Sequence, residues 1–225
     1  ELIQNNIPFD DLSLEIENKF GYKKTFVFFG RIHPHKNIIQ MMKLFIESNL
    51  IDKGWSFEIY GIPDDQKYLS QIIKLKSNYP QIKILKPVFG VKKAEIINRS
   101  WANILISKSE VLSFSVLEAG FYGLPSVITD NIETLKEDQI SQKVKSDPKK
   151  IINKLREIAD WPLKKRKLVG DKTNLFFNNY KKESDVTFLQ NLNLAYLKIF
   201  NKKIYSAVSS SENFYIASLV HSMNV

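Results

Sequence analysis

Short apolar runs alternate with amphipathic stretches along the first two thirds of the chain. Runs this short and this apolar are typical of strands that are buried on both faces of a parallel sheet. They lie at residues 25–29, 56–60, 82–85, 103–106 and 126–128. The stretches between them have helical periodicity and lie near residues 37–48, 65–78, 92–100 and 115–122. Strands at this spacing, each followed by a helix, predict a series of βαβ units.

From about residue 147 the pattern becomes helical. Asp147 followed by Pro148 is a typical helix start, with an N-cap residue before a proline at the first helical position. Helices are expected over residues 148–158, 163–180 and 186–200, whereas residues 204–225 show no clear period. The whole pattern predicts an α/β fold, a doubly wound, Rossmann-like parallel sheet with helices on both faces and a helical C-terminal cover. Ligands of such sheets bind outside the carboxyl ends of the strands.

The composition excludes several classes of protein. The chain has 225 residues, of which 44% are hydrophobic and 25% are charged, so it can bury a core and is not intrinsically disordered. No apolar run approaches the roughly 18 residues that span a bilayer. The absence of Cys rules out disulfides, thiolate zinc ligands and a cysteine nucleophile, and fits a reducing, cytoplasmic location. The chain begins with Glu-Leu-Ile and has no signal-peptide pattern, so we expect it to start within a longer reading frame.

The net charge of +9 is concentrated in the last third of the chain. Residues 1–140 carry 17 basic and 17 acidic side chains, whereas residues 141–203 carry 16 basic and 6 acidic ones. A solvated helical face is the simplest interpretation, and an anionic membrane surface or a nucleic acid are the alternatives. No nucleic-acid-binding module accompanies the charge, so we expect no nucleic-acid partner. The membrane hypothesis rests on Lys149, Lys150, Lys154, Lys164, Lys165, Arg166 and Lys167.

The loop after the first predicted strand carries two cations. Gly30 allows a sharp turn, and Arg31 and Lys36 follow it before the next helix begins. Cations beside a helix N-terminus suit a diphosphate, because fixed charge and free amide groups then point at the same anion. Two solvated surface cations are the alternative. His33 and His35 flank a proline, and since no further ligands accompany them, we interpret them as loop residues rather than a metal site.

The segment 107–125 carries two glutamates, Glu110 and Glu118, with Ser113 and Ser115 between them where a helix is expected to start. In a continuous helix the two carboxylates would stand about 12 Å apart. This is more than the roughly 5–9.5 Å that separates the paired carboxylates of glycosidases. The spacing therefore favours two acceptors that grip separate hydroxyl groups of an elongated ligand, with an anion at the helix start. Two glutamates at this spacing are also common by chance.

Taken together, these landmarks resemble the C-terminal, donor-binding half of the family-4-type retaining glycosyltransferases (glycosyl transferases group 1), which have the GT-B fold. The order matches throughout: GRIHPHKN, EIYG, VFG at 88–90, WANILIS, the two glutamates and LEAGFYGLP. The opening IQNNIP looks like the interdomain linker of these enzymes. The resemblance implies a linker and lead-in at 1–20 and a donor nucleotide-sugar-binding domain at 21–200. Residues 201–225 would be a tail of unclear structure.

The resemblance also implies a role for each matching position. Arg31 and Lys36 would hold the donor diphosphate and neutralise its charge as it leaves. Glu110 would accept hydrogen bonds from the transferred sugar. Together, Arg31, Lys36 and Glu110 are the implied catalytic residues. Glu118 would bind the nucleotide ribose. Residues 88–90 would line the base pocket, and the amides of residues 114–116 would contact the phosphates. The remaining implied donor-binding residues are Gly30, Gly61, Val88, Phe89, Gly90, Ser113, Phe114, Ser115 and Val116.

Neither a metal nor a cofactor is expected in enzymes that resemble this chain, and the sequence shows no metal-ligand cluster. It also lacks a Gly-x-Gly-x-x-Gly fingerprint, which disfavours a site for NAD. The sequence departs from the family pattern at two places. Val111-Leu112-Ser113 replaces the usual Gly-Phe-Gly after the first glutamate, where a glycine permits close phosphate approach, and Asn37 replaces the usual Gly after the lysine.

No part of the chain resembles the acceptor-binding N-terminal half of these enzymes. Three hypotheses follow. In the first, the chain is the donor-binding domain of a glycosyltransferase, inactive alone, that works with an acceptor-binding domain in the same full-length chain or in a separate subunit. In the second, it is a non-catalytic nucleotide-sugar-binding module. In the third, it is a basic domain that associates with the inner membrane face. The sequence does not identify the base, the sugar or the acceptor.

Overall fold

Six parallel strands form one sheet in the order β3-β2-β1-β4-β5-β6. The computed structural model describes residues 22–108, 113–131 and 141–179, all within the compact unit Phe9–Asn179. The strand order reverses at β1, so the doubly wound, Rossmann-like sheet predicted from the sequence is confirmed. The strands are β1 (Thr25–Phe29), β2 (Ser56–Tyr60), β3 (Ile82–Leu85), β4 (Ala102–Leu105), β5 (Ser126–Thr129) and β6 (Ser141–Val144).

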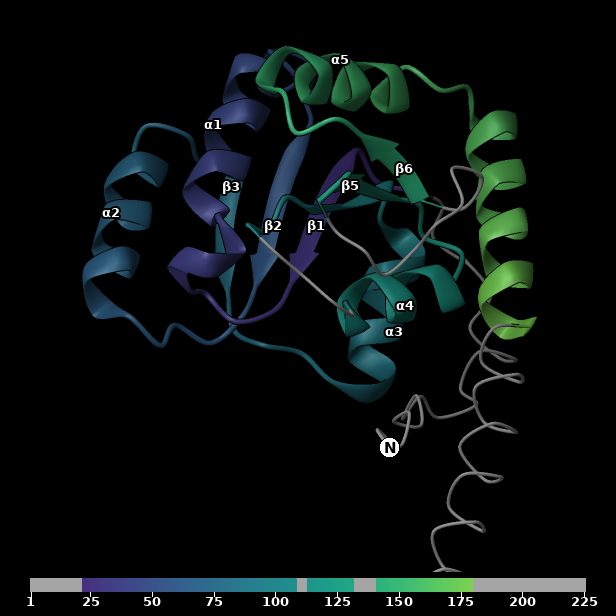
Figure 1. Cartoon of the computed structure of the whole chain (residues 1–225), viewed down its shortest axis with the longest axis horizontal. Coiled ribbons are helices and arrows are strands. Elements are labelled where there is room, and N and C mark those ends of the chain that lie inside the picture. The colour runs from purple at the N-terminus through teal and green to yellow at the C-terminus, as the bar shows by residue number, and fades with distance from the viewer. Residues whose placement is uncertain (1–21, 109–112, 132–140, 180–225) are drawn as a thin grey trace, which may run out of the picture. The chain divides into compact units, whose positions relative to one another are not determined.

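Helices cover both faces of the sheet (Figure 1). One face carries α1, α2 and α5, and the other carries α3 and α4. A further helix occupies residues 163–179 and supplies part of the predicted C-terminal cover. The helices are α1 (Ile38–Glu47), α2 (Gln66–Lys76), α3 (Gly90–Arg99), α4 (Phe114–Phe121) and α5 (Pro148–Ala159), with short 3₁₀ turns at Pro34–Lys36 and Ile51–Lys53. In the described ranges, no helix is long and apolar enough to cross a membrane.

The predicted elements agree with the observed ones to within one or two residues, with one strand missed. That strand is β6, Ser141–Val144, whose sequence SQKV has a single apolar residue. It pairs with β5 and ends the strand order, so it does not need the apolar residues of a strand that is buried on both faces. The helix expected over 186–200, the linker at 1–20 and the tail at 201–225 lie outside the described residues.

Side-chain caps explain where two of the helices begin. The carboxylate of Asp65 accepts a hydrogen bond from the amide of Tyr68 at 2.8 Å, at the start of α2. The carboxylate of Asp147 does the same for the amide of Lys150 at 2.9 Å, and Pro148 follows it at the first helical position. This is the N-cap pattern that the sequence predicts for α5.

The helix at 163–179 packs closely on α4. A Cβ atom on Gly120 would lie 2.1 Å from the ring of Phe177, so only glycine fits at that position of α4. After α4 ends, the backbone of Gly123 faces Gly170, where a Cβ atom would lie 2.7 Å from the Gly123 carbonyl oxygen. The side-chain amide of Asn174 donates to the carbonyl of residue 121. These close approaches fix α4, whose first turn faces the site described below.

Arg166 is buried, which corrects the expectation that it faces a membrane. Only 1% of the residue is exposed. Its guanidinium donates hydrogen bonds to the backbone carbonyls of Ser100, Trp101 and Gly123, and it lies 4.5 Å from the ring centroid of Tyr22. Burial lowers the pKa of Arg166 to about 10, so the guanidinium is still charged at neutral pH. Arg166 therefore joins the helix to the end of the sheet and is not a surface cation.

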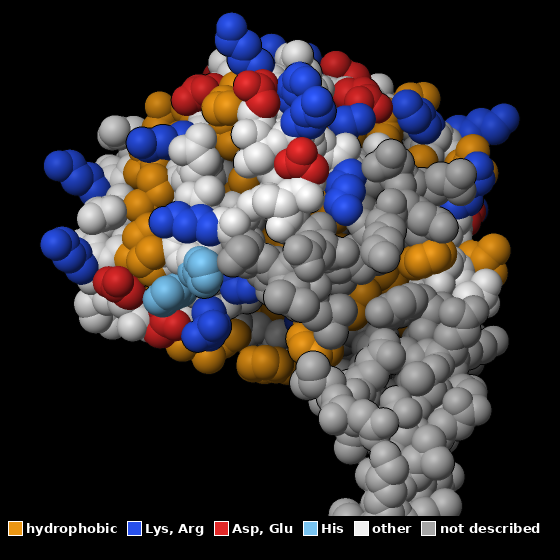
Figure 2. Space-filling model, in the orientation of Figure 1, with side chains coloured by type: hydrophobic (Ala, Val, Ile, Leu, Met, Phe, Trp, Pro, Cys, Tyr) orange, Lys and Arg blue, Asp and Glu red, His pale blue; other side chains and the backbone are white. Residues whose placement is uncertain are grey.

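The other lysines of the membrane hypothesis lie at or near the surface. Lys154 forms an ion pair with Glu157 at 2.7 Å and is half-buried. Figure 2 shows Lys and Arg side chains spread over the visible face with Asp and Glu side chains between them. The exposed lysines of this group are Lys149, Lys150, Lys164, Lys165 and Lys167.

Candidate functional site

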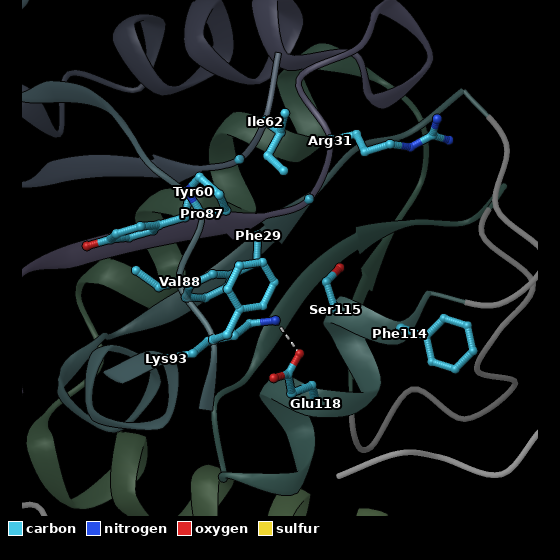
Figure 3. A pocket seen from close by; sticks show the side chains of 13 residues that line it. Phe29, Arg31, Tyr60, Ile62, Pro87, Val88, Lys93, Phe114, Ser115 and Glu118 are labelled. Carbon is cyan, nitrogen blue, oxygen red and sulfur yellow. Dashed lines mark hydrogen bonds and ion pairs between the residues drawn. The ribbon is translucent and has the colours of Figure 1, made fainter. Parts of the chain in front are cut away.

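A cavity of about 290 Å³ opens at the carboxyl ends of β1 and β2 (Figure 3). Its walls come from the loops after β1, β2 and β3, from the first turn of α3 and from the first half of α4. This is the edge of the sheet where the strand order reverses and where ligands of doubly wound sheets bind. The sequence-predicted residues that line it are Gly30, Arg31, Gly61, Val88, Phe89, Phe114, Ser115 and Glu118.

Two glycines allow the loops after β1 and β2 to run side by side. A Cβ atom on Gly61 would lie 2.0 Å from the carbonyl oxygen of Gly30, so position 61 excludes every side chain. The amide of Gly30 donates to the carbonyl of Tyr60 at 3.0 Å, and the amide of Ile32 donates to the carbonyl of Ile62 at 2.9 Å. These bonds extend the sheet pairing beyond the strands, and they place Arg31 and Ile62 in the cavity wall.

Arg31 and Lys36, the two predicted diphosphate ligands, differ in position. Arg31 lines the cavity with an exposed side chain, and its guanidinium lies 3.5 Å from the carboxylate of Asp64. Lys36 is half-buried in the 3₁₀ turn Pro34–Lys36 and does not line the cavity. The amide of Lys108 donates to the carbonyl of residue 35 at 3.1 Å, so this turn lies against the loop after β4. Asp64 was not among the residues predicted from the sequence.

Asn37 stands where the family pattern has glycine, and its backbone explains that preference. Its φ of 57° and ψ of 34° are left-handed, and it joins the 3₁₀ turn to the first residue of α1. Asparagine tolerates this conformation better than other residues with a side chain, whereas glycine adopts it without strain. The departure from the family pattern at this position is therefore a conservative one.

We expect Asn37→Gly to leave the free energy of unfolding within about 0.5 kcal/mol of the parent, because glycine adopts left-handed backbone freely. We expect Asn37→Val to lower it by about 1–2 kcal/mol, because a left-handed conformation brings Cβ too close to a carbonyl oxygen. Urea denaturation of the three proteins measures both effects. Equal stability of the glycine and valine variants would contradict this explanation.

Two stacked aromatic rings form one wall of the cavity. The rings of Phe29 and Tyr60 lie 5.2 Å apart with an interplanar angle of 16°. The Tyr60 hydroxyl donates to the Glu58 carboxylate at 2.7 Å, and Lys83 and Arg99 contact the same carboxylate at 3.1 and 3.4 Å. Burial and the Glu58 carboxylate raise the pKa of Tyr60, so its hydroxyl remains a neutral donor. These contacts hold the Tyr60 ring in place.

The pKa of Glu58 follows from the same group of contacts. Burial raises the pKa, but the hydrogen bonds from Tyr60 and Lys83 and the charges of Lys83 and Arg99 outweigh it, so the pKa is lowered overall. Glu58 is 7% exposed and remains ionised at neutral pH. Its role is therefore to hold the residues behind the aromatic wall.

Lys93 and Glu118 form an ion pair beside the same wall. The Lys93 ammonium donates to Oε2 of Glu118, and it lies 5.2 Å from the ring centroid of Phe29 (Figure 3). Lys93 comes from α3 and Glu118 from α4, so the pair joins the two helices on this face of the sheet. Glu118 is a predicted site residue, whereas Lys93 was missed.

Gly90, Val116 and Ser113 are predicted residues that do not line the cavity. Gly90 begins α3, with a left-handed φ of 54°. Val116 is 1% exposed and its side chain belongs to the core. Ser113 is buried at the N-cap of α4, with its hydroxyl 3.1 Å from that of Ser115. Glu110 lies outside the described residues, together with residues 111 and 112. The lining residues that the sequence analysis missed are Phe29, Tyr60, Ile62, Pro87 and Lys93.

His33 and His35 interact with each other rather than with further metal-ligating side chains. Nδ1 of His33 accepts a hydrogen bond from the backbone amide of His35 at 3.2 Å, which caps the 3₁₀ turn. Across the described ranges, no three His, Asp or Glu side chains are grouped so that they would hold a metal ion. Both histidines lie in the loop that joins β1 to α1.

The fold and the cavity define a Rossmann-like domain with a ligand site at the carboxyl edge of its sheet. The chain belongs to the family Glycosyl transferases group 1, whose model matches residues 10–174. A comparison with curated proteins gives no match.

Solved glycosyltransferases of the GT-B fold are similar in structure but distant in sequence. A variant of S. aureus TarM, in complex with fondaparinux, α-GlcNAc-glycerol and UDP, has a TM-score of 0.64 and 15% identity, with 78% of this chain and 36% of that chain covered. The α,α-trehalose 6-phosphate synthase from Burkholderia multivorans has a TM-score of 0.63 and 13% identity, with 86% of this chain and 45% of that chain covered.

The pneumococcal O-GlcNAc transferase GtfA, in complex with UDP and GlcNAc, has a TM-score of 0.54 and 17% identity, with 76% of this chain and 37% of that chain covered. The chain therefore spans less than half the length of each of these three proteins. These comparisons confirm the family and the fold that the sequence motifs indicated.

Proposed function

We propose that this chain is the donor-binding domain of a retaining glycosyltransferase that takes its sugar from a nucleoside diphosphate sugar. The observation that carries the proposal is the cavity at the switch point of the sheet, in a chain of this family. The cavity brings together a cation (Arg31), the first turn of α4 and a carboxylate (Glu118). Two of the structural neighbours were solved with UDP, which makes UDP the first ligand to test.

In this proposal the diphosphate lies beside Arg31 and the N-terminus of α4. The N-terminal amides of α4 and the positive end of its dipole favour an anion there. Arg31 and Lys36 supply fixed positive charge where negative charge develops on the departing diphosphate. The ribose lies toward Glu118, and the base lies against Val88 and Phe89, where the exposed Phe89 ring offers an apolar face. Glu110 accepts hydrogen bonds from the transferred sugar.

The acceptor is bound outside this chain. The chain covers 36–45% of the three neighbours described above, so more than half of each has no counterpart here. We infer that an acceptor-binding domain, in the same full-length chain or in a separate subunit, completes the active site. Under this proposal the chain alone binds the donor nucleotide but does not transfer sugar. The alternative hypothesis of a non-catalytic module predicts the same nucleotide binding. It differs because it predicts no sugar transfer after the acceptor-binding domain is supplied.

Replacing either Arg31 or Lys36 by alanine is expected to weaken UDP binding at least tenfold. A hydrogen bond to a charged group contributes about 1.5–3 kcal/mol, and the proposal assigns the diphosphate one such contact from each of the two side chains. Isothermal titration calorimetry measures the change. Lys43→Ala is the matched control, because Lys43 is an exposed cation on α1 away from the cavity lining, and it should leave the affinity unchanged. Unaltered affinity in both test variants would show that the diphosphate does not bind at this loop.

A further inference from the structure

The Lys93–Glu118 pair has the chemistry of a two-hydroxyl subsite. Both residues line the cavity, and their side chains are only 16% and 20% exposed. The ammonium of Lys93 is held between the carboxylate of Glu118 and the ring face of Phe29. A strong donor and a strong acceptor therefore stand side by side at the edge of an otherwise largely apolar wall.

Each member of the pair has hydrogen-bonding capacity beyond the contact between them. The Lys93 ammonium carries three donors, and the carboxylate of Glu118 has a second oxygen. Among the described residues, Lys93 is the side chain that donates to the Glu118 carboxylate, through Oε2, which leaves Oε1 available to a ligand. Since the pair is largely shielded from water, hydrogen bonds added there are stronger than on the open surface.

A vicinal diol matches this arrangement. Each hydroxyl both donates and accepts, so one hydroxyl donates to Oε1 of Glu118 while its neighbour accepts from Nζ of Lys93. A phosphate group would be repelled by the carboxylate, whereas the two neighbouring hydroxyls of a diol provide a donor for Glu118 and an acceptor for Lys93 at the same time. The 2′- and 3′-hydroxyls of a ribose are such a diol.

We propose that Lys93 is a specificity-determining residue, which binds one hydroxyl of the ribose diol while Glu118, already assigned to the ribose in the proposed function, binds the other. The inference rests on the proposed function, because it requires a nucleoside diphosphate in the cavity. It goes further by assigning to Lys93 one of the two hydroxyls and by making the ion pair, rather than Glu118 alone, the recognition element.

The test compares ribose and dideoxyribose ligands by isothermal titration calorimetry. UDP, ADP and GDP are titrated first, and the tightest of them is compared with its 2′,3′-dideoxy form and with inorganic pyrophosphate. The parent protein is expected to bind the ribose form at least tenfold more tightly than the dideoxy form. Lys93→Met is expected to weaken the ribose form at least fivefold and to leave the dideoxy form and pyrophosphate within twofold.

Two further variants separate recognition from charge and from folding. Lys92→Met removes the same charge from the neighbouring, exposed position of α3 and should preserve the preference for ribose. Lys93→Arg keeps a charged donor beside Glu118 and should retain most of the preference for the ribose form. This variant also provides the test if Lys93→Met fails to fold. In a protein that also carries Glu118→Gln, Lys93→Met should weaken binding of the ribose form by a smaller factor than it does alone.

Two results would overturn the inference. An unchanged ribose preference in Lys93→Met would show that Lys93 does not read the diol. Tighter binding of the ribose form by Lys93→Met would show that Lys93 competes with the ribose for Glu118. Failure of the proposed function looks different, because the parent protein would then bind neither the three nucleotides nor pyrophosphate, and the inference would fall with it.

Discussion

Replacing Arg166 by methionine is expected to lower the free energy of unfolding by about 3 kcal/mol. The substitution leaves the carbonyls of Ser100, Trp101 and Gly123 without their donor, and each unsatisfied buried acceptor costs about 1–3 kcal/mol. Relief of the desolvation cost of the buried guanidinium offsets part of this loss.

Urea denaturation measures the effect of the Arg166 substitution. Lys167→Met is the matched control, because Lys167 is the next residue, carries the same charge and is exposed. Its stability should stay within about 0.5 kcal/mol of the parent, as is usual for surface substitutions. A loss in Arg166→Met no larger than that of the control would show that the buried guanidinium does not hold the helix at 163–179 to the sheet.

Gly61→Ala is expected to lower the free energy of unfolding by about 3 kcal/mol and to weaken UDP binding more than tenfold. The added Cβ would lie 2.0 Å from the carbonyl oxygen of Gly30, and a backbone atom cannot move aside as a flexible side chain can. Overpacking of this kind costs about 1–3 kcal/mol and sometimes more. The loops after β1 and β2 must then separate, which displaces Arg31 from the cavity wall.

Gly54→Ala is the control for the alanine substitution at Gly61. Gly54 has a left-handed φ of 78°, and a Cβ there would meet no atom within 4 Å. It should therefore cost only the roughly 1 kcal/mol of backbone strain and leave UDP binding intact. If Gly61→Ala were no more destabilising than Gly54→Ala, the close approach of the two loops would not be needed for the fold.

The fold was predictable because its central strands are apolar on both faces. Runs such as TFVFF in β1 have all five residues buried, as expected for a strand that is covered on both faces. β6 was not predictable from hydrophobicity, because it ends the strand order and its sequence, SQKV, is largely polar. Arg166 was also misassigned, because it stands among three lysines and sequence alone does not show which one of four adjacent cations faces inward.

The site was predictable where a residue follows a strand directly. Arg31, Gly61 and Glu118 could be found because parallel strands bring their carboxyl ends to one edge of the sheet. Lys93 could not be found in this way. It lies on the first turn of a helix beside another lysine, where a solvated cation is the usual interpretation, and only the packing of α3 against α4 brings it to Glu118.

The most direct test of the central claim is a crystal structure of this chain with UDP at saturating concentration. The account predicts that the diphosphate lies beside Arg31 and the first turn of α4, and that the ribose lies against Glu118 and Lys93. UDP bound elsewhere on the chain, or a cavity that stays empty while UDP saturates the crystal, would contradict it.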